Sequence, residues 1–501
     1  MEEKTNQKKI LRTLLNAFVI IPLLFGMYGF MVMEGESFAD SLYRIILMFS
    51  MNYGEAPPNF CVEIARWTAL AADAAIVVSA ISFAREKACN FFKYCFGDSI
   101  AVYGPENEKK ELLKQFKWHQ RVDGGNKFVM AHRYVLLNNE ASNFDFYNEH
   151  RKKLCSKKVY IRADSLWTRF INKDNVKIFS PEESAARLFW KSKELWDDAE
   201  KSPYRLADRH GHELDIVLIG FGRLGAELIY WGMQNNIFFP DQRIRYHVFG
   251  DCTGFISTHT ELEHISDKIF QHSEPWTDWV GFIEKADIVL VPEQKEQDAL
   301  LKDLLFTTTR KNIYVFAPKD SLFAELKKTD GFDDRFIIFP WQEESYKWEN
   351  IEKDLLFKSA MAVNDRYNSQ VREAGNAELA KEWEELDAFT KYSNVSTADY
   401  DEIRRRIFKC RNMPIPETKD KISEPLCEEM SELEHIRWCR YHYLNNWKTM
   451  DRIEGCSSKD KERRLHADLV DYKDLSDKSR DKDKEITRDI IARLKFTDTI
   501  F

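Results

Sequence analysis

The sequence predicts a membrane α-helical hairpin with a pore loop, followed by α/β doubly wound Rossmann-like domains and a small, mainly α-helical C-terminal domain. Three observations lead to this fold class. Long uncharged stretches lie almost entirely before Phe92. From residue 98 onward, strand-like and helix-like patterns alternate, which is typical of parallel sheets covered by helices. Near the C-terminus, the apolar residues recur with helical periodicity.

Composition narrows the possible functions. The 501 residues provide room for about three domains. The formal net charge is −8 and no long basic stripe occurs, so we expect no nucleic-acid partner. The nine cysteines are scattered without a Cys-x-x-Cys pair, which predicts reduced thiols facing a cytosol, with neither a disulfide frame nor a zinc site.

Two apolar stretches predict the membrane hairpin. Leu14–Met33 contains twenty residues without a charge, enough to cross the ~30 Å hydrocarbon core. The second stretch, Trp67–Phe83, is shorter and contains Asp73. A cleaved signal peptide is the alternative for the first stretch, but no small-residue cleavage site precedes Glu34.

Basic residues set the expected orientation. They flank both stretches on their outer sides, at Lys4, Lys8, Lys9, Arg12, Arg85, Lys87 and Lys93. The positive-inside rule then predicts a multi-pass protein of the cell inner membrane, in contact with membrane lipid, with both termini in the cytoplasm. Residues 34–60 would lie outside.

The segment between the two stretches contains a pore-loop pattern. An apolar helix expected at Asp40–Phe49 is followed by Ser-Met-Asn-Tyr-Gly-Glu at residues 50–55. This resembles the filter of two-helix potassium channels, Thr-Val-Gly-Tyr-Gly-Asp. Asn52 replaces the first filter glycine, and asparagine tolerates the left-handed backbone that a filter needs. The resemblance implies a selectivity filter made of Ser50, Met51, Asn52, Tyr53, Gly54 and Glu55.

Each membrane assignment has a simpler alternative. Residues 50–55 are otherwise an ordinary loop after a short amphipathic helix. Asp73 is expected to line the pore, because carboxylates within a membrane usually face water or a partner. Its alternative is a hydrogen bond to a neighbouring helix or to Arg66.

The first α/β unit is expected between residues 98 and 190. Its helix opener Ser180-Pro-Glu-Glu combines an N-cap serine, a proline and first-turn acids. Val159–Arg162 and Ser180–Leu188 resemble the closing part of domains that regulate potassium conductance (the RCK family). The loop after Gly104 lacks dinucleotide-binding glycines, so we expect no nucleotide in this unit.

The second α/β unit contains Gly-x-Gly-x-x-Gly at the turn from an apolar strand, Leu214–Ile219, into a helix. Such glycines let backbone amides approach a pyrophosphate, and an acid after the next strand can bind a ribose hydroxyl. The alternative is tight strand–helix packing around an empty site. Tandem units behind a pore resemble RCK gating rings. The expected nucleotide-binding residues are Gly220, Gly222, Arg223, Gly225 and Asp251.

The C-terminal segment resembles the RyR repeat domain of ryanodine receptors, which also occurs in prokaryotic proteins. Matching positions are Glu434, His435, Arg437, Trp438, Trp447, His466, Leu469, Val470, Leu475, Lys482 and Asp483. The first six are the expected ligand residues, because Trp, Arg and His can stack on and pair with a nucleotide-like ligand. The alternative is an ion pair and a tryptophan core. We assign no metal, since the histidines lack zinc-like spacing.

Four parts are expected in this order: a pore domain at 1–92 with its loop at 38–58, Rossmann-like domains at 93–195 and 211–375, and linker helices with the RyR-like domain at 380–501. The resemblances imply a tetrameric, potassium-like cation channel gated by NAD or an ADP-ribose-like nucleotide, acting as a defence or stress effector. A regulatory subunit of a potassium transporter and a membrane-anchored nucleotide-dependent enzyme are the alternatives. We expect no enzyme, because serine-hydrolase, zinc-protease and Walker motifs are missing.

Overall fold

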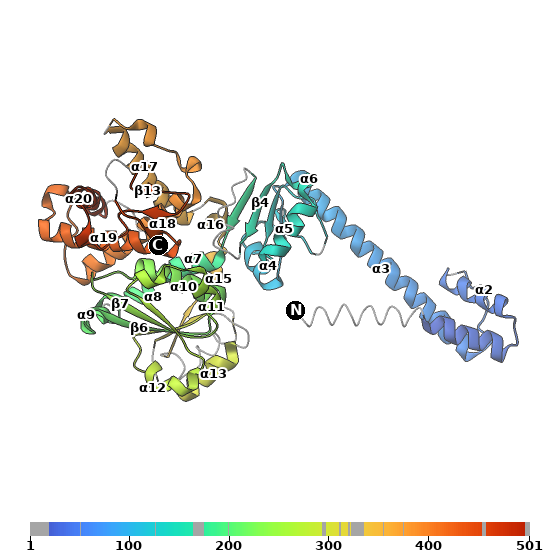
Figure 1. The fold of residues 1–501 in the computed structure, drawn as a ribbon. Helices are drawn as coiled ribbons and strands as arrows, with labels where there is room; N and C mark the ends of the chain where they lie inside the picture. The colour runs from blue at the N-terminus through green and yellow to red at the C-terminus, as the bar shows by residue number, and fades with distance from the viewer. Residues whose placement is uncertain are drawn as a thin grey trace. The chain divides into compact units, whose positions relative to one another are not determined.

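The computed structural model describes most of the chain, which Figure 1 shows as a ribbon. The described residues are 20–50, 52–125, 127–163, 175–198, 200–292, 297–309, 312–318, 321, 335–353, 355–373, 375–452 and 457–495. The chain divides into two compact units. The first comprises Met1–Val135 and Ser156–Lys158, and the second comprises Leu136–Cys155 and Val159–Phe501.

The first unit begins with packed helices. These are the π-helix η1 (Tyr28–Met33), α2 (Phe38–Phe49) and the long α3 (Phe60–Phe96). Ser37 begins α2, since its hydroxyl accepts the Asp40 amide at 3.2 Å. Ile45 of α2 and Val62 of α3 are fully buried between these helices, because Gly26 and Gly29 allow the close approach of their side chains.

The predicted membrane hairpin is wrong, and so is the predicted multi-pass location in the inner membrane. Among the described residues, no helix combines the length and the apolar character that crossing a bilayer requires. The first apolar run is α-helical at 20–27 and then becomes the π-helix η1, while 14–19 lie outside the described residues. α3 is long, but it contains Glu63, Arg66 and Asp73 near its apolar part. The prediction relied on the number of uncharged residues in a row, whereas crossing a bilayer depends on the length and apolar character of the helix that those residues form.

A five-stranded sheet follows α3, and the expected parallel α/β pattern is found in it. The strand order is β2-β1-β3-β4-β5, with β1 parallel to β2 and β4 parallel to β5. Ser180 caps the next helix as predicted, accepting the Glu183 amide at 3.2 Å. The elements are β1 (Ile100–Tyr103), α4 (Glu106–Leu113), β2 (Arg121–Asp123), β3 (Arg133–Leu136), α5 (Glu140–Glu149), α6 (Arg151–Leu154), β4 (Lys158–Arg162), β5 (Val176–Phe179) and α7 (Pro181–Trp190).

A six-stranded parallel sheet forms the core of the second unit, in the order β11-β10-β9-β6-β7-β8. Its strands are β6 (Glu213–Ile219), β7 (Arg243–Phe249), β8 (Lys268–Gln271), β9 (Ile288–Val291), β10 (Ile313–Phe316) and β11 (Phe336–Phe339). Its helical connections include α10 (Gly222–Asn235), α11 (Thr253–Thr258), η3 (Leu262–His264), η4 (Trp276–Trp279), α12 (Val280–Ile283) and α13 (Gln297–Thr307). The Rossmann-like sheet expected here is therefore present.

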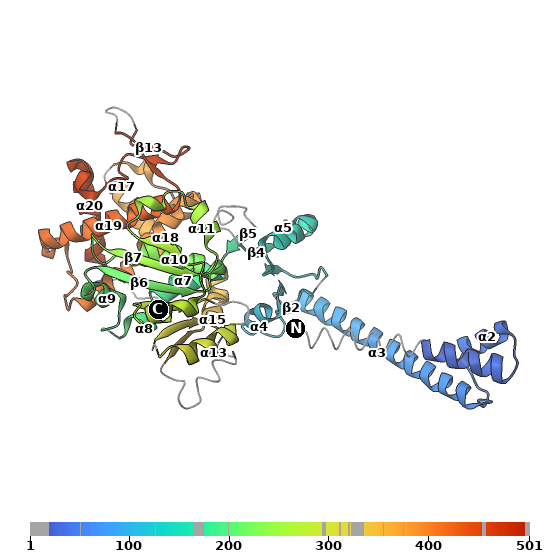
Figure 2. The same ribbon diagram turned by 60° about the horizontal axis from the view of Figure 1, so that its bottom comes forward.

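The central strand β6 is buried on both faces of this sheet. Leu214, Ile216 and Leu218 pack into the core that includes α10, whereas Val217 and Ile219 pack into the core that includes α13. Figure 2 shows the sheet with α10 on one side and α13 on the other. Because successive side chains of a strand point to opposite faces, a strand covered on both sides reads as a continuous apolar run.

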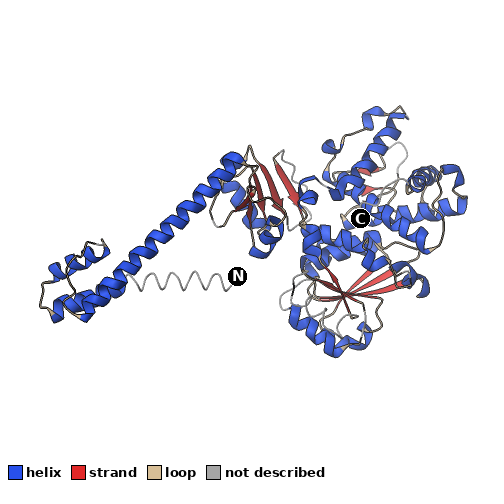
Figure 3. Ribbon diagram, turned by 180° about the vertical axis from the view of Figure 1, so that it is seen from behind, coloured by secondary structure: helices blue, strands red, loops and turns tan. Residues whose placement is uncertain are grey.

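The C-terminal part of the second unit is mainly helical, as Figure 3 shows by its blue ribbons. A small sheet, in the order β12-β14-β13, completes it. The main elements are α17 (Lys358–Glu373), α18 (Ala388–Cys410), α19 (Glu424–Leu444), β12 (Lys448–Thr449), β13 (Lys459–Asp460), β14 (Leu465–His466) and α20 (Asp477–Arg493). Shorter helices are α8 (Lys193–Trp196), α9 (Pro203–Arg209), α15 (Trp341–Ser345), α16 (Trp348–Lys353), η5 (Leu355–Phe357), η6 (Ala377–Leu379), η7 (Trp383–Glu385), η8 (Lys419–Lys421) and η9 (Tyr472–Asp474).

Gly232 of α10 generates a stability prediction. A Cβ atom there would lie 2.8 Å from the Tyr246 hydroxyl oxygen and 3.0 Å from Cζ2 of the buried Trp190 ring. We expect Gly232→Ala to lower the free energy of unfolding by roughly 1–3 kcal/mol through overpacking. Gly254→Ala is the matched control, because no atom lies within 4 Å of its added Cβ. Urea unfolding of both variants checks this, and a Gly232→Ala chain as stable as Gly254→Ala would contradict it.

Candidate functional site

The candidate site lies at the carboxyl end of β6. β6 lies in the middle of the sheet. On one side of it lie β7 and then β8, and on its other side lie β9, β10 and β11 in that order. Numbered from β6, this is the order 3-2-1-4-5-6 of dinucleotide-binding sheets. In such sheets, the ligand lies outside the carboxyl ends of the strands, at the point where the order reverses. The predicted glycine loop occupies that point.

The first two glycines shape the turn from β6 into α10. Gly220 has φ +95° and Gly222 has φ +57°, a backbone region that side chains disfavour. Phe221 is the N-cap residue and makes no side-chain capping bond. The amides of Gly222, Arg223 and Leu224 therefore begin the helix without intrahelical acceptors. The space where a Gly222 side chain would lie is open to 4 Å.

The remaining glycines let the neighbouring loops pack. A Cβ atom on Gly225 would lie 2.9 Å from the Phe221 ring, which folds over the first turn of α10. Gly250, which follows β7, would place a Cβ 3.1 Å from the backbone of Gly220 and Phe221. Gly250 was not among the predicted nucleotide-binding residues, although it directly precedes Asp251 in the sequence. Packing thus accounts for Gly225 and Gly250, whereas the space beside Gly222 is open.

Arg223 is held by charged and backbone groups of the preceding elements. Its guanidinium lies 3.2 Å from the Glu182 carboxylate of α7 and donates a hydrogen bond to the Ala163 carbonyl, which follows β4. Arg162 of β4 pairs with the same Glu182 oxygen. The Glu182 side chain is buried, so this ion-pair cluster ties the glycine loop to β4 and α7.

Asp251 lies at the carboxyl end of β7, two residues beyond the strand. Its carboxylate is exposed and accepts the Thr253 amide at 3.0 Å. This amide, together with the Thr253 hydroxyl, lowers the pKa of the Asp251 carboxyl. The acid is therefore ionised at neutral pH and accessible at the edge where a ribose would lie.

The predicted RyR-like ligand residues separate into two groups. Arg437 is buried and donates to Glu434 at 3.0 and 2.7 Å and to the Ser396 hydroxyl at 2.8 Å. Burial alone would raise the pKa of Glu434, but Arg437 and Arg404 lower it to about 2. This geometry favours the alternative of an ion pair that holds the fold.

The aromatic members of this set pack together around His442. Trp438 lies 4.1 Å from the His442 ring and 4.9 Å from the His466 ring, between centroids. Trp447 is buried and stacks on Phe389 at 5.0 Å. Arg437 instead contacts α18 through Ser396, so Arg437 and Trp438 lie on different faces of α19.

The predicted filter residues lie in the loop after α2. Ser50 ends α2, and the Asn52 amide donates to the Leu47 carbonyl at 3.0 Å. Neither Asn52 nor Gly54 has a positive φ, so the left-handed backbone expected at Asn52 is not found. Glu55 pairs with Arg44 at 3.0 Å. Met51 lies outside the described residues.

Tyr53, predicted for the filter, and Asp73, predicted to line the pore, lie in different surroundings. Tyr53 is buried and its ring lies edge-on to Phe30, with centroids 6.2 Å apart. Asp73 is half-buried on α3, and its Oδ2 atom makes no hydrogen bond with the described residues. The proposed bond from Asp73 to Arg66 is therefore not formed by Oδ2.

Comparison with known proteins supplies no relative for this site. No protein-family model, no curated protein and no solved structure matches the chain. The resemblances to potassium channels, RCK domains and RyR domains therefore stay predictions.

His435 of α19 generates a pH prediction. Its Nδ1 lies 3.2 Å from the Asp483 carboxylate and its Nε2 lies 2.8 Å from the Val470 carbonyl. Burial alone would lower the pKa of His435, but Asp483, Cys439 and Val470 raise it to about 10. Because the folded pKa is raised, this stabilisation is fully present below pH 6.5 and is lost as the pH rises through 10.

Asp483→Asn tests this pH dependence. We expect the variant to be about 1.5–3 kcal/mol less stable than wild type near pH 6, the usual cost of a charged hydrogen bond. The difference should shrink toward zero as the pH passes 10. Urea unfolding of both chains between pH 6 and 10.5 measures it. A difference that does not change with pH would contradict a protonated His435.

Proposed function

We propose that this chain is a nucleotide-responsive regulatory protein whose six-stranded sheet binds a dinucleotide-type ligand, such as NAD or ADP-ribose, at the glycine loop. One observation carries the proposal: the glycine loop lies at the reversal point of a parallel sheet with the order 3-2-1-4-5-6. A glycine pattern alone occurs in many proteins, but few such patterns lie at that point of such a sheet.

The loop offers a pyrophosphate the groups it requires. The amides of Gly222, Arg223 and Leu224 point along the start of a helix of 14 residues, whose dipole favours an anion. The open space beside Gly222 admits phosphate oxygens close to the backbone. The exposed carboxylate of Asp251 is placed to accept hydrogen bonds from ribose hydroxyls.

The contacts of Arg223 support a regulatory role, in which a bound ligand changes the ion pairs of the protein. A phosphate at the loop would compete with Glu182 for the Arg223 guanidinium, because both are anions beside the same cation. Glu182 belongs to α7, whose Arg187 pairs with Asp399 of α18 at 2.6 Å. Ligand binding at the loop would thus weaken the Arg223–Glu182 ion pair. Glu182 lies on α7, the helix that contacts α18 of the C-terminal part.

The channel expectation is not carried into this proposal. It depended on the predicted membrane spans, and no described helix is long and apolar enough to cross a bilayer. What remains is the nucleotide-responsive part of that expectation, which depends on the second unit alone.

Gly222→Val tests the proposal, because its branched side chain would fill the open space beside the loop. The matched control is Gly211→Val, just before β6 at its opposite end. Gly211 has φ +65° and also has no atom within 4 Å of an added Cβ, so both variants carry the same backbone strain. Thermal unfolding of both chains with NAD or ADP-ribose is the measurement.

We expect wild type and Gly211→Val to be stabilised by about 2.7 kcal/mol at a ligand concentration of 100 times Kd. Gly222→Val should show no stabilisation at that concentration. Equal ligand responses in the two variants, or no response of wild type to either nucleotide, would favour the packing-only alternative.

A further inference from the structure

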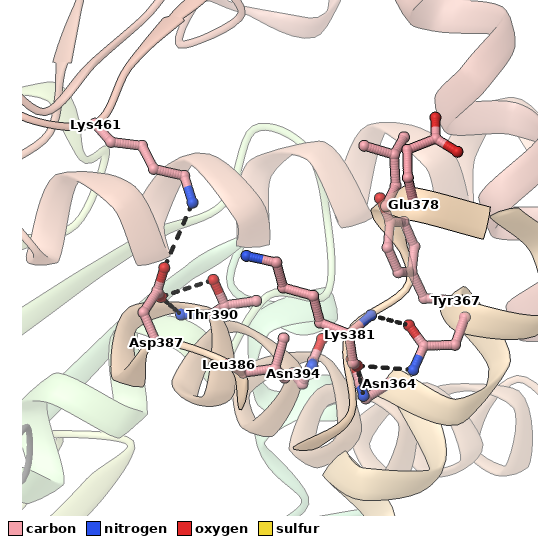
Figure 4. A pocket seen from close by; sticks show the side chains of 11 residues that line it. Asn364, Tyr367, Glu378, Lys381, Leu386, Asp387, Thr390, Asn394 and Lys461 are labelled. Carbon is pink, nitrogen blue, oxygen red and sulfur yellow. Dashed lines mark hydrogen bonds and ion pairs between the residues drawn. The ribbon is translucent and has the colours of Figure 1, made fainter. Parts of the chain in front are cut away.

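A cavity between α17, the segment that follows it and the start of α18 is a candidate binding site outside the glycine loop. Its volume is about 380 Å³, which is in the range of small-molecule sites. Figure 4 shows its lining side chains, and they come from separate parts of the second unit. They are Asn364, Tyr367, Asn368, Glu378, Leu379, Lys381, Leu386, Asp387, Thr390, Asn394 and Lys461.

One side of the cavity is built around the backbone of Lys381. Two buried asparagines of α17 bind it: Asn364 and Asn368 donate to its carbonyl at 2.9 and 2.8 Å, and Asn368 accepts its amide at 3.0 Å. The backbone of Lys381 is thereby fixed, and its side chain extends over the cavity (Figure 4). Its ammonium has no carboxylate partner among the described residues.

The opposite side begins α18. Asp387 caps this helix of 23 residues, accepting the Thr390 amide and hydroxyl, both at 2.7 Å. Its other oxygen lies 3.4 Å from the Lys461 ammonium, which reaches the cavity from the turn after β13. Burial alone would raise the pKa of Asp387, but the Thr390 amide and hydroxyl outweigh it and lower that pKa. The ionised carboxylate therefore holds Lys461 at the rim.

Uncharged groups complete the walls. Tyr367 is 50% exposed and Leu379 is 54% exposed, so both present apolar surface to water at the cavity. Asn394 lies on the same face of α18 as Thr390, and its half-buried amide makes no hydrogen bond with the described residues. Glu378 adds a carboxylate to the lining.

We propose that this cavity binds a small phosphorylated metabolite that carries a ring, of the size of a nucleoside monophosphate. Lys381 and Lys461 bind its phosphate, since ammonium groups are natural phosphate ligands. Tyr367 and Leu379 cover the ring, as aromatic and apolar side chains do in ligand pockets. The amide of Asn394 binds a polar edge of the ligand. The glycine loop takes no part, so this site and the proposed function stand or fall separately.

Residue-specific lysine labelling tests the proposal on the full chain. The protein is treated with an amine-reactive reagent in the presence of AMP or of inorganic pyrophosphate, and the modified lysines are identified by mass spectrometry. We expect AMP to protect Lys381 and Lys461 several-fold while leaving the exposed Lys478 of α20 unchanged. The same protection is expected in Gly222→Val, because the glycine loop is not involved.

Substitutions sharpen the test. Asn394→Ala removes one hydrogen bond to the ligand and should raise the AMP concentration for half-protection of Lys381 roughly tenfold. Lys381→Met should raise the AMP concentration for half-protection of Lys461 by at least as much. The control Lys478→Met should leave the half-protection concentrations of both Lys381 and Lys461 unchanged. Absence of protection up to ~10 mM AMP, or protection that disappears in Gly222→Val but persists in Gly211→Val, would overturn the site. Equal protection by pyrophosphate and AMP would overturn the binding of the ring.

Discussion

Buried arginines hold the C-terminal helices against the six-stranded sheet. Arg440 of α19 donates to both oxygens of Asp267, at 2.8 and 2.9 Å, and Asp267 also accepts the Ile244 amide of β7 at 3.1 Å. Arg187 of α7 makes a similar double contact with Asp399 of α18. Charges taken out of water are tolerated only when their partners are well placed, so these pairs require a defined register of α18 and α19 on the sheet.

This register also fixes the candidate nucleotide site. α10 lies between the sheet and the helices that the arginines hold, and Gly232 allows its contact with Trp190 of α7. A helix packed on both sides keeps its amino end in one place, which is what an anion site built from backbone amides needs. The Glu182–Arg223 pair then makes the loop sensitive to the position of α7.

α18 is common to both proposed sites. Asp387 at its amino end borders the cavity that contains Lys381, and Asp399 further along pairs with Arg187 of α7. α7 in turn contacts the glycine loop through Glu182. The buried Arg187–Asp399 pair joins these two helices, which offers a physical route for coupling between ligands at the two sites.

The sequence by itself determined the features that depend on neighbours a few residues away. The strand–loop–helix unit around Gly220–Gly225, the Ser180 cap and the Glu434–Arg437 pair one turn apart were all visible, because turn geometry, capping and helical spacing are local. The predicted membrane hairpin failed although its signal was also local. An uncharged run does not show which kind of helix forms, and part of the first run, Tyr28–Met33, is a π-helix.

Only the tertiary structure decided the contacts between distant segments. Gly250 became necessary because the loop after β7 folds onto the loop after β6, and Asp267 became the partner of Arg440 because α19 packs on that edge. The cavity joins Lys381 to Lys461, eighty positions apart, through two buried asparagines and a helix cap. Packing brings such groups together through the burial of many apolar side chains at once, and no short stretch of sequence records that.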